Sequence, residues 1–265
     1  MAIVTVDYFS KALMRTVTIH AIVPVDKVEN EKYISQNKYK TLYLLHGILG
    51  NDTDWIVQTR IKHWAQEQEI VVIMPSGENK FYVDNPKSHE YFSRFIGEEL
   101  VEITRQMFPL SSKREDTCIG GLSMGGYGAI INGLKYHQTF GSIIGMSSAL
   151  LLDDIIHSKD GDDIPYLYKR SYLESVFGDL NQLIGSDKDY QELIRNLCLE
   201  KQLIPRIYLT CGTEDFLIKE NRAYRDLLKH YHVDYLYEEF QGDHDWEFWN
   251  QAMKNAMTWW LQKRV

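Results

Sequence analysis

The chain has 265 residues, of which 44% are hydrophobic and 25% are charged, and these values suit one large globular domain with a sizeable core. A formal net charge of −8, with Lys and Arg scattered along the chain, argues against nucleic-acid binding. There is neither a run of 18 apolar residues nor the basic start and apolar run of a signal peptide, so we expect a cytoplasmic protein that does not cross a membrane. Cys118, Cys198 and Cys211 show no C-x-x-C spacing and are expected to be free thiols in a reducing compartment.

The first predicted elements are the two strands of an antiparallel hairpin, over residues 3–9 and 15–24, where apolar and polar residues alternate. Five nearly continuous apolar runs follow, of the kind that suits strands buried on both faces of a parallel sheet. They cover residues 41–47, 70–77, 116–123, 141–148 and 206–215, and one more strand is expected over 233–240. Helical patterns cover residues 60–69, 91–108, 125–136, 217–231 and 246–263. Within 91–108, Phe92, Phe95, Ile96, Leu100, Ile103 and Met107 recur at helical spacing. This alternation predicts an α/β fold with a mostly parallel central sheet, an N-terminal antiparallel hairpin and helices on both faces.

One segment, residues 149–200, interrupts the alternation, because it is acidic and mixed in composition and holds no convincing buried strand. It is either a surface excursion or a small cap insertion across the strand ends, where open α/β sheets bind ligands. We favour the cap. No internal repeat, low-complexity tract or linker divides the chain, so residues 1–265 are expected to form a single domain.

The most informative stretch is Gly121-Leu122-Ser123-Met124-Gly125, which fits the G-x-S-x-G pattern. A strand is predicted before it and a helix after it, which is the context of a nucleophile elbow. In such an elbow the serine takes a strained backbone conformation, and side chains at positions 121 and 125 would collide with neighbouring backbone. The alternative is a glycine-rich strand–helix turn without chemistry. The predicted context favours Ser123 as a catalytic nucleophile.

A nucleophilic serine needs a histidine as its base and a carboxylate to orient that histidine. The histidines after Ser123 are His137, His157, His230, His232 and His244. His137 ends the elbow's own helix, roughly 20 Å away. His244 follows the last predicted strand directly, at the sheet edge where the elbow also lies, so we assign it as the base. A metal ligand or a plain surface histidine is the alternative at this position, but no second His or Cys lies at ligand spacing, so we expect neither a metal nor a cofactor.

The acid and the oxyanion hole are assigned from the ends of two other strands. Asp215 follows the strand at 206–212 and is the preferred acid, with Glu214 as the alternative; a carboxylate here also suits a helix cap. An oxyanion hole needs two N–H donors, and we assign the backbone N–H groups of Met124, just after the nucleophile, and of Ile48. His46 is expected to hold the second loop through hydrogen bonds.

With these residues in place, the sequence resembles the esterase D group of the α/β-hydrolase superfamily, and within it the bacterial tributyrin esterase (EstA-type) branch. The resemblance covers nearly the whole chain. It rests on residues 43–55 (YLLHGILGNDTDW), 71–84 (VVIMPSGENKFYVD), 112–129 (SKREDTCIGGLSMGGYGA), 177–180 (FGDL), 211–217 (CGTEDFL) and 242–249 (GDHDWEFW). It implies the α/β-hydrolase fold, a homo-oligomer, and a serine carboxylesterase for short-chain esters with Ser123, Asp215 and His244 as its triad.

The substrate is less constrained than the chemistry. Trp55, Tyr82, Asp84, Trp246 and Trp249 are candidates for a pocket that takes an aromatic or sugar leaving group, with a structural role in the core as the alternative for each. Acetylated or feruloylated sugars are therefore candidate small-molecule substrates. A thioesterase such as S-formylglutathione hydrolase is an alternative, although those enzymes carry an SGLTC-like segment where this chain has HGILG. A non-catalytic binding protein of the same fold is the remaining alternative, disfavoured because serine, acid and histidine are all present in the right order.

Overall fold

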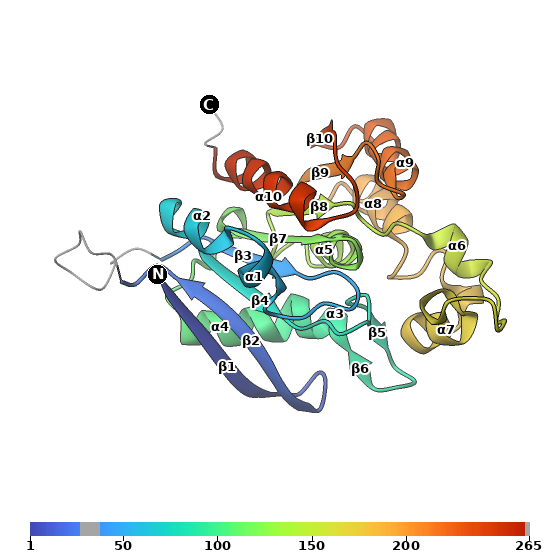
Figure 1. Ribbon diagram of the computed structural model, residues 1–265, viewed down its shortest axis with the longest axis horizontal. Coiled ribbons are helices and arrows are strands. Elements are labelled where there is room, and N and C mark those ends of the chain that lie inside the picture. Colours follow the sequence, from blue (N-terminus) through green and yellow to red (C-terminus); the bar gives the residue numbers. More distant parts are fainter. Residues whose placement is uncertain (27–37, 263–265) are drawn as a thin grey trace.

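The computed structural model describes residues 1–26 and 38–262, and within them the predicted sheet is present (Figure 1). The main sheet has the strand order β1-β2-β4-β3-β7-β8-β9-β10. The bounds of its strands are β1 Ala2–Ser10, β2 Arg15–Val23, β3 Thr41–Leu45, β4 Val71–Pro75, β7 Thr117–Leu122, β8 Ser142–Met146, β9 Arg206–Gly212 and β10 Tyr235–Phe240. In this sheet β2 pairs antiparallel with both β1 and β4, and all the other neighbouring strands of the sheet pair parallel. The predicted mostly parallel sheet with an N-terminal hairpin is thus confirmed.

Burial along each strand follows its place in the sheet. Residues of β1 alternate between half-buried and exposed, because this edge strand has one face toward solvent. Every residue of β3, β4, β7 and β8 is buried. Alternate residues of β3 enter two different cores: Leu42 and Leu44 one, Tyr43 and Leu45 the other. Helices on both faces therefore explain why these strands read as unbroken apolar runs.

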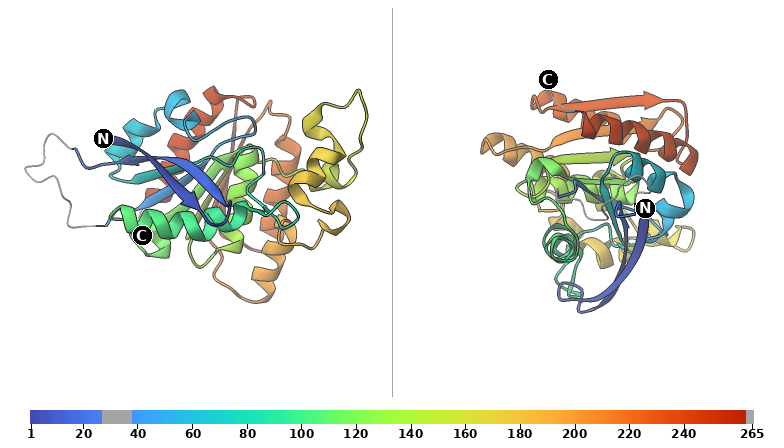
Figure 2. Two further views of the ribbon diagram at one scale, coloured as in Figure 1. Left: turned by 90° about the horizontal axis from the view of Figure 1, so that it is seen from below. Right: turned by 90° about the vertical axis from the view of Figure 1, so that its left-hand side faces the viewer.

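One face of the sheet is covered by α1 (Asp54–Gln58), α2 (Ile61–Glu67) and α10 (Trp246–Leu261), which share a core with Leu42, Leu44 and Val72. The other face is covered by α4 (Leu100–Met107), α5 (Met124–Lys135), α8 (Tyr190–Leu199) and α9 (Ile218–His230). Figure 2 shows the sheet between these two layers. The predicted helix at 246–263 ends at Leu261, and Lys263 lies outside the described residues.

The helix predicted at 91–108 begins as α3 (Phe92–Arg94) and passes through a π-helical turn at Phe95–Glu99 into α4. Its apolar residues Phe92, Phe95, Ile96 and Leu100 are buried. Met107 shares their helical spacing, but its side chain is 47% exposed. It is the last residue of α4.

The segment 149–200 contains α6 (Leu152–Ile156), α7 (Arg170–Phe177) and α8, and no strand among its residues, all of which the structure describes. Figures 1 and 2 show α6 and α7 together at the end of the molecule away from the N-terminus, beside the small sheet of β5 (Asp84–Asn85) and β6 (Glu90–Tyr91). The segment is tied to the elbow helix α5 by the ring of Tyr127, which meets Phe177 and Tyr190 edge-on. It is therefore packed into the main core at both of these points.

Candidate active site

Ser123 lies between β7 and α5 in a strained turn, with φ 53° and ψ −118°. Glycines on either side make this turn possible. A Cβ on Gly121 would lie 2.4 Å from the carbonyl oxygen of Gly125, and a Cβ on Gly125 would lie 2.5 Å from the carbonyl oxygens of Leu45 and His46. These neighbours are backbone atoms, which cannot move aside as a side-chain end can. The G-x-S-x-G pattern thus has the steric basis that the sequence predicts for it.

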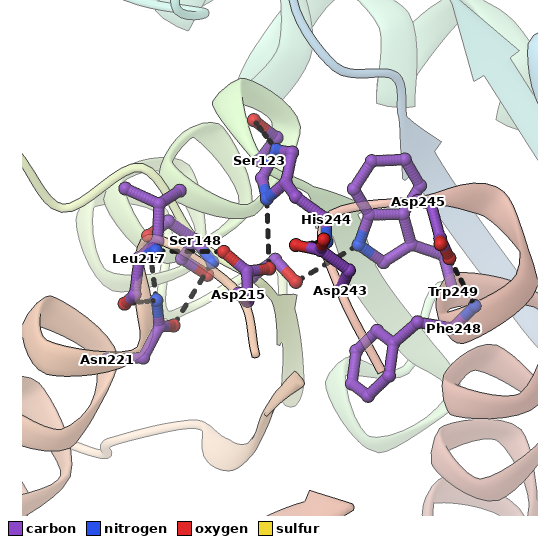
Figure 3. A network of polar contacts seen from close by, with 11 residues as sticks. Ser123, Ser148, Asp215, Leu217, Asn221, Asp243, His244, Asp245, Phe248 and Trp249 are labelled. Atoms are coloured by element: carbon purple, nitrogen blue, oxygen red, sulfur yellow. Dashed lines mark hydrogen bonds and ion pairs between the residues drawn. The ribbon is translucent and has the colours of Figure 1, made fainter. Parts of the chain in front are cut away.

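The structure brings Ser123, His244 and Asp215 together from the ends of three strands of the sheet (Figure 3). Nε2 of His244 lies 3.0 Å from Oγ of Ser123, and Nδ1 lies 2.9 Å from Oδ2 of Asp215. Ser123 follows β7, Asp215 follows β9 and His244 follows β10. Parallel strands end at the same edge, so three residues that are distant in sequence meet there.

The environment of Asp215 favours its ionised form. Burial by itself raises the pKa of this carboxyl, but hydrogen bonds from His244, the Ser147 hydroxyl and the Leu217 N–H outweigh it, so the pKa lies below its usual value. An ionised carboxylate only accepts hydrogen bonds, so the proton of His244 sits on Nδ1. Nε2 is then free to accept the Ser123 hydroxyl proton. The arrangement can perform general-base activation of a serine.

Two of the alternatives to these residues have exposed side chains. Glu214 is exposed, whereas Asp215 is 1% exposed and in contact with His244. Of the other histidines, His157 has an exposed side chain and pairs with Asp153 on α6. Within residues 1–26 and 38–262 no group of three or more His, Cys, Asp or Glu side chains is placed to hold a metal ion.

The loop that carries Ile48 is fixed by His46. The N–H of Gly77 donates to Nε2 of His46 over 2.8 Å, so Nδ1 carries the ring proton and donates to the carbonyl of Gly47 over 2.7 Å. Burial lowers the pKa of His46, which keeps this ring neutral. A further bond of 2.7 Å runs from the N–H of Leu49 to Oδ1 of Asn79. Ile48 is thereby held at the edge of the cavity that contains Ser123.

Met124 begins α5, so its N–H is one of the first helical N–H groups, which have no partner within the helix. Both Met124 and Ile48 border the cavity beside Ser123. The positive end of the helix macrodipole also points toward this region. The geometry around the serine is therefore suited to a negatively charged oxygen.

Two cavities border Ser123 and His244. The larger cavity has a volume of about 460 Å³ and mainly apolar walls, and it is lined in part by Phe81, Ile155 and Leu173. Much of its wall comes from the segment 149–173. The smaller cavity, of about 250 Å³, is lined by the loop at 47–50 and by Asp54, Trp246 and Trp249.

The predicted pocket residues divide into two groups. Trp246 and Trp249 line the smaller cavity. The expectation is wrong for Trp55 and Tyr82, which are 1% and 0% exposed and line neither cavity. Both are held in the core by polar tips, since the Trp55 indole donates to the carbonyl of Leu45 and the Tyr82 hydroxyl to that of His46.

Asp84 also lines neither cavity. Its carboxylate accepts the N–H of Arg94 over 3.1 Å and pairs with Nζ of Lys135 at 3.6 Å. These contacts tie the start of β5 to α3 and α5, so Asp84 has a structural role and the pocket expectation is wrong for it as well.

Two residues beside the triad, Phe216 next to His244 and Ser147 next to Asp215, are not among the residues predicted from the sequence. The ring of Phe216 lies 4.6 Å from the His244 ring, and Phe216 is 63% exposed at the mouth of the larger cavity. Ser147, which follows β8, contacts Asp215. Phe216 had a usable signal in its position directly after the acid, and Ser147 had one in its position at the end of the apolar run at 141–148.

No helix within residues 1–26 and 38–262 is long and apolar enough to cross a membrane.

Comparison with known proteins places this chain in a family. The Esterase family model matches residues 10–260. The chain is 48% identical to an acetyl esterase of Caldicellulosiruptor saccharolyticus over 266 residues, which cover 98% of each protein. The structure of FphF, a fluorophosphonate-binding serine hydrolase of Staphylococcus aureus, is similar with a TM-score of 0.87 and 30% identity over 99% of each chain. An S-formylglutathione hydrolase of Staphylococcus aureus matches with a TM-score of 0.85 and 30% identity, covering 98% of this chain and 99% of the other. The chain belongs to the Esterase family of α/β-hydrolases and is a carboxylic ester hydrolase.

Proposed function

We propose that this enzyme is a serine esterase for short acyl chains, with Ser123 as nucleophile, His244 as general base and Asp215 as the acid that orients it. The observation that carries the proposal is the placement of the His244 ring, which bridges Oγ of Ser123 at 3.0 Å and Oδ2 of Asp215 at 2.9 Å. Both separations are within the range for proton transfer along a hydrogen bond.

The reaction proceeds in two steps. Nε2 of His244 takes the Ser123 proton as Oγ attacks the ester carbonyl, and then returns that proton to the leaving alcohol. Water, deprotonated by the same nitrogen, attacks the acyl carbon; the bond from that carbon to Oγ then breaks, His244 returns the proton to Ser123, and the carboxylic acid product leaves. Asp215 stays ionised throughout and stabilises the imidazolium that forms in each step.

The backbone N–H groups of Met124 and Ile48 are the proposed oxyanion hole. Donors of this kind act on the charge that develops on the carbonyl oxygen, and each typically contributes about 3–4 kcal/mol to the transition state. The bonds that fix His46 between Gly47 and Gly77 keep one of these donors in place before the substrate arrives. This preorganisation means that little reorganisation is needed during the reaction.

The larger cavity is the proposed acyl site, because its apolar walls meet Ser123 and Met124 directly. The smaller cavity, with its carboxylate and two tryptophans, then receives the alcohol. The relative that is 48% identical is an acetyl esterase, which supports short acyl groups and makes acetylated sugars a candidate substrate class.

The test is hydrolysis of p-nitrophenyl esters with acyl chains of two to sixteen carbons by wild type, Ser123→Ala and Ser148→Ala. Ser148 is a matched control because it is a buried serine whose hydroxyl has no hydrogen-bond partner among the described residues. We expect activity on the shortest chains in wild type and Ser148→Ala, and none in Ser123→Ala. Activity that survives Ser123→Ala would contradict the mechanism.

A thioesterase is the second candidate, supported by the similarity to an S-formylglutathione hydrolase at 30% identity. The same three side chains serve either reaction, since only the leaving atom changes from oxygen to sulfur. Measuring kcat/KM for S-formylglutathione beside p-nitrophenyl acetate separates the two. A value for the thioester that exceeds the ester by a hundredfold or more would favour the thioesterase.

A further inference from the structure

Ser147 and Trp249 form a buried polar chain behind the acid of the proposed triad. We propose that these two side chains are positioning residues, which fix Asp215 in the orientation that His244 needs. The inference rests on the proposed function, since it assigns a role to groups that act through Asp215.

The chain of contacts runs from α10 through the end of β8 to Asp215. Nε1 of Trp249 lies 3.1 Å from Oγ of Ser147, and the Ser147 hydroxyl is in turn a neighbour of the Asp215 carboxylate, whose pKa it helps to lower. Trp249 is 6% exposed, Ser147 is 0% exposed and Asp215 is 1% exposed. Because all three groups are buried, each hydrogen bond constrains its neighbours more than it would at the surface.

The chemistry of the three groups fixes the direction of every proton in the chain. An indole N–H only donates, so Ser147 must accept from Trp249. Its own hydroxyl proton is then available to Asp215, whose carboxylate only accepts. The second carboxylate oxygen, Oδ1, accepts the N–H of Leu217 over 2.8 Å. Asp215 is thus held from two sides while Oδ2 faces His244.

Trp249 also touches the base itself. Its ring meets the His244 ring edge-on, with centroids 4.9 Å apart at 86° (Figure 3). One aromatic side chain therefore packs against the imidazole and, through Ser147, orders the carboxylate. The Cys211 thiol is a further neighbour of Ser147 and Asp215. Burial raises the pKa of this thiol, so it remains neutral and does not compete with Asp215 as the negatively charged partner of His244.

The backbone of Ser147 indicates that its hydroxyl has a purpose. Its φ is +46°, in the left-handed region where glycine is more comfortable than a residue with a Cβ. Its N–H donates to the carbonyl of Thr210 over 2.8 Å, which anchors it to the next strand. A side chain kept in a strained conformation within a site is the kind of feature that function maintains.

This backbone conformation provides a sharp pair of variants, Ser147→Ala and Ser147→Gly. Both remove the hydroxyl, but glycine relieves the positive φ and alanine does not, so we expect a higher Tm for Ser147→Gly. If the hydroxyl positions Asp215, kcat falls about 10–100-fold in both variants, since a hydrogen bond to a charged group is lost. KM should stay within about twofold, because neither variant alters the cavity walls.

Trp249→Phe tests the other end of the chain, since it removes the indole N–H and keeps an aromatic ring against His244. We expect a fall in kcat in the same direction. In the double variant Ser147→Ala/Trp249→Phe, kcat should be no lower than in the less active of the two single variants, because Trp249 acts on Asp215 through Ser147. The single variant Trp249→Phe also carries the test if either Ser147 variant does not fold.

Two matched controls lie nearby. Ser148→Ala removes a buried hydroxyl, and Trp260→Phe removes a buried indole N–H from the same helix α10; neither polar atom has a partner among the described residues. Both should keep wild-type kcat on p-nitrophenyl acetate. The inference is overturned if Ser147→Ala and Trp249→Phe match these controls, if kcat follows Tm between the two Ser147 variants, or if the losses in the double variant add. Retained activity in Ser123→Ala would instead refute the proposed function itself, and the two failures are therefore distinguishable.

Discussion

The identity of the acid is best tested by Asp215→Asn, which keeps the shape of the side chain and removes one acceptor. In the structure Oδ1 accepts from the N–H of Leu217 over 2.8 Å, and Oδ2 faces Nδ1 of His244 at 2.9 Å. An amide has one oxygen, so it satisfies one of these donors and presents an N–H to the other. Each of its two orientations therefore has a defined cost.

If the amide oxygen faces Leu217, its NH₂ group faces Nδ1 of His244, and the ring must carry its proton on Nε2. That nitrogen then cannot accept the proton of Ser123. If the oxygen faces His244 instead, the buried N–H of Leu217 is left facing a donor, at a cost of about 1–3 kcal/mol, or about 5–150-fold in the active population. The loss of the negative charge removes a further stabilisation of the imidazolium of about 1.5–3 kcal/mol. Together these predict a fall in kcat of about 10²–10⁴-fold.

The measurement is steady-state hydrolysis of p-nitrophenyl acetate by wild type, Asp215→Asn and Glu214→Gln, with far-ultraviolet circular dichroism to establish that each is folded. Glu214→Gln is the matched control, because it makes the same chemical change in the adjacent, exposed carboxylate. It should keep wild-type kcat. More than a tenth of wild-type kcat in Asp215→Asn would refute the reasoning, and a large loss in Glu214→Gln would move the acid to that residue.

Three further predictions concern the elbow, the cavity and the surface. Gly125→Ala places a Cβ 2.5 Å from two backbone carbonyl oxygens, so we expect a lower Tm and little esterase activity; a wild-type Tm in a thermal melt would contradict the steric argument. Ala149→Leu adds bulk to the wall of the larger cavity and should reduce kcat/KM for octanoate more than for acetate in a p-nitrophenyl ester series. Equal losses for the two esters would mean that the acyl chain binds outside this cavity. Bidentate hydrogen bonds from Arg222 lower the pKa of Glu239 to about 2 from 4.5, so its stabilising contribution is present above pH 4.5 and is lost as the pH falls toward 2. Urea unfolding should therefore show that the stability difference between wild type and Glu239→Gln narrows over this range, and a constant difference would count against it.

The three triad residues that the sequence predicts share one property, which is that each follows a predictable strand. An apolar run ending in a polar residue identifies both a buried strand and the residue at its carboxyl end. In a parallel sheet these ends lie at one edge, so the strand order β7-β8-β9-β10 gathers Ser123, Asp215 and His244 without further information. Homo-oligomerisation has no such local signal and stays a prediction.

Trp55 and Tyr82, predicted to line a pocket but found in the core, show that residue type alone does not determine which environment an aromatic side chain enters. Trp55 and Tyr82 are amphipathic side chains, and such side chains suit either a cavity wall or a core with a polar partner. Both found backbone carbonyl acceptors inside the protein. Which of the two environments an aromatic enters depends on the packing of α1 and of the loop at 76–83, and neither follows from residue types alone.

Ser147 and Trp249 illustrate the deeper limit, because they are separated by 102 positions in the chain. Their hydrogen bond depends on the register of β8 against β9 and on the rotation of α10 over the sheet. A one-residue slip of β8 would move Ser147 to the opposite face. Trp246 and Trp249 lie three positions apart on α10, yet only Trp249 is placed to donate to Ser147. The triad side chains lie at strand ends and are therefore predictable as candidates, whereas the contacts that hold them depend on how strands and helices fit together, and only the structure supplies those contacts.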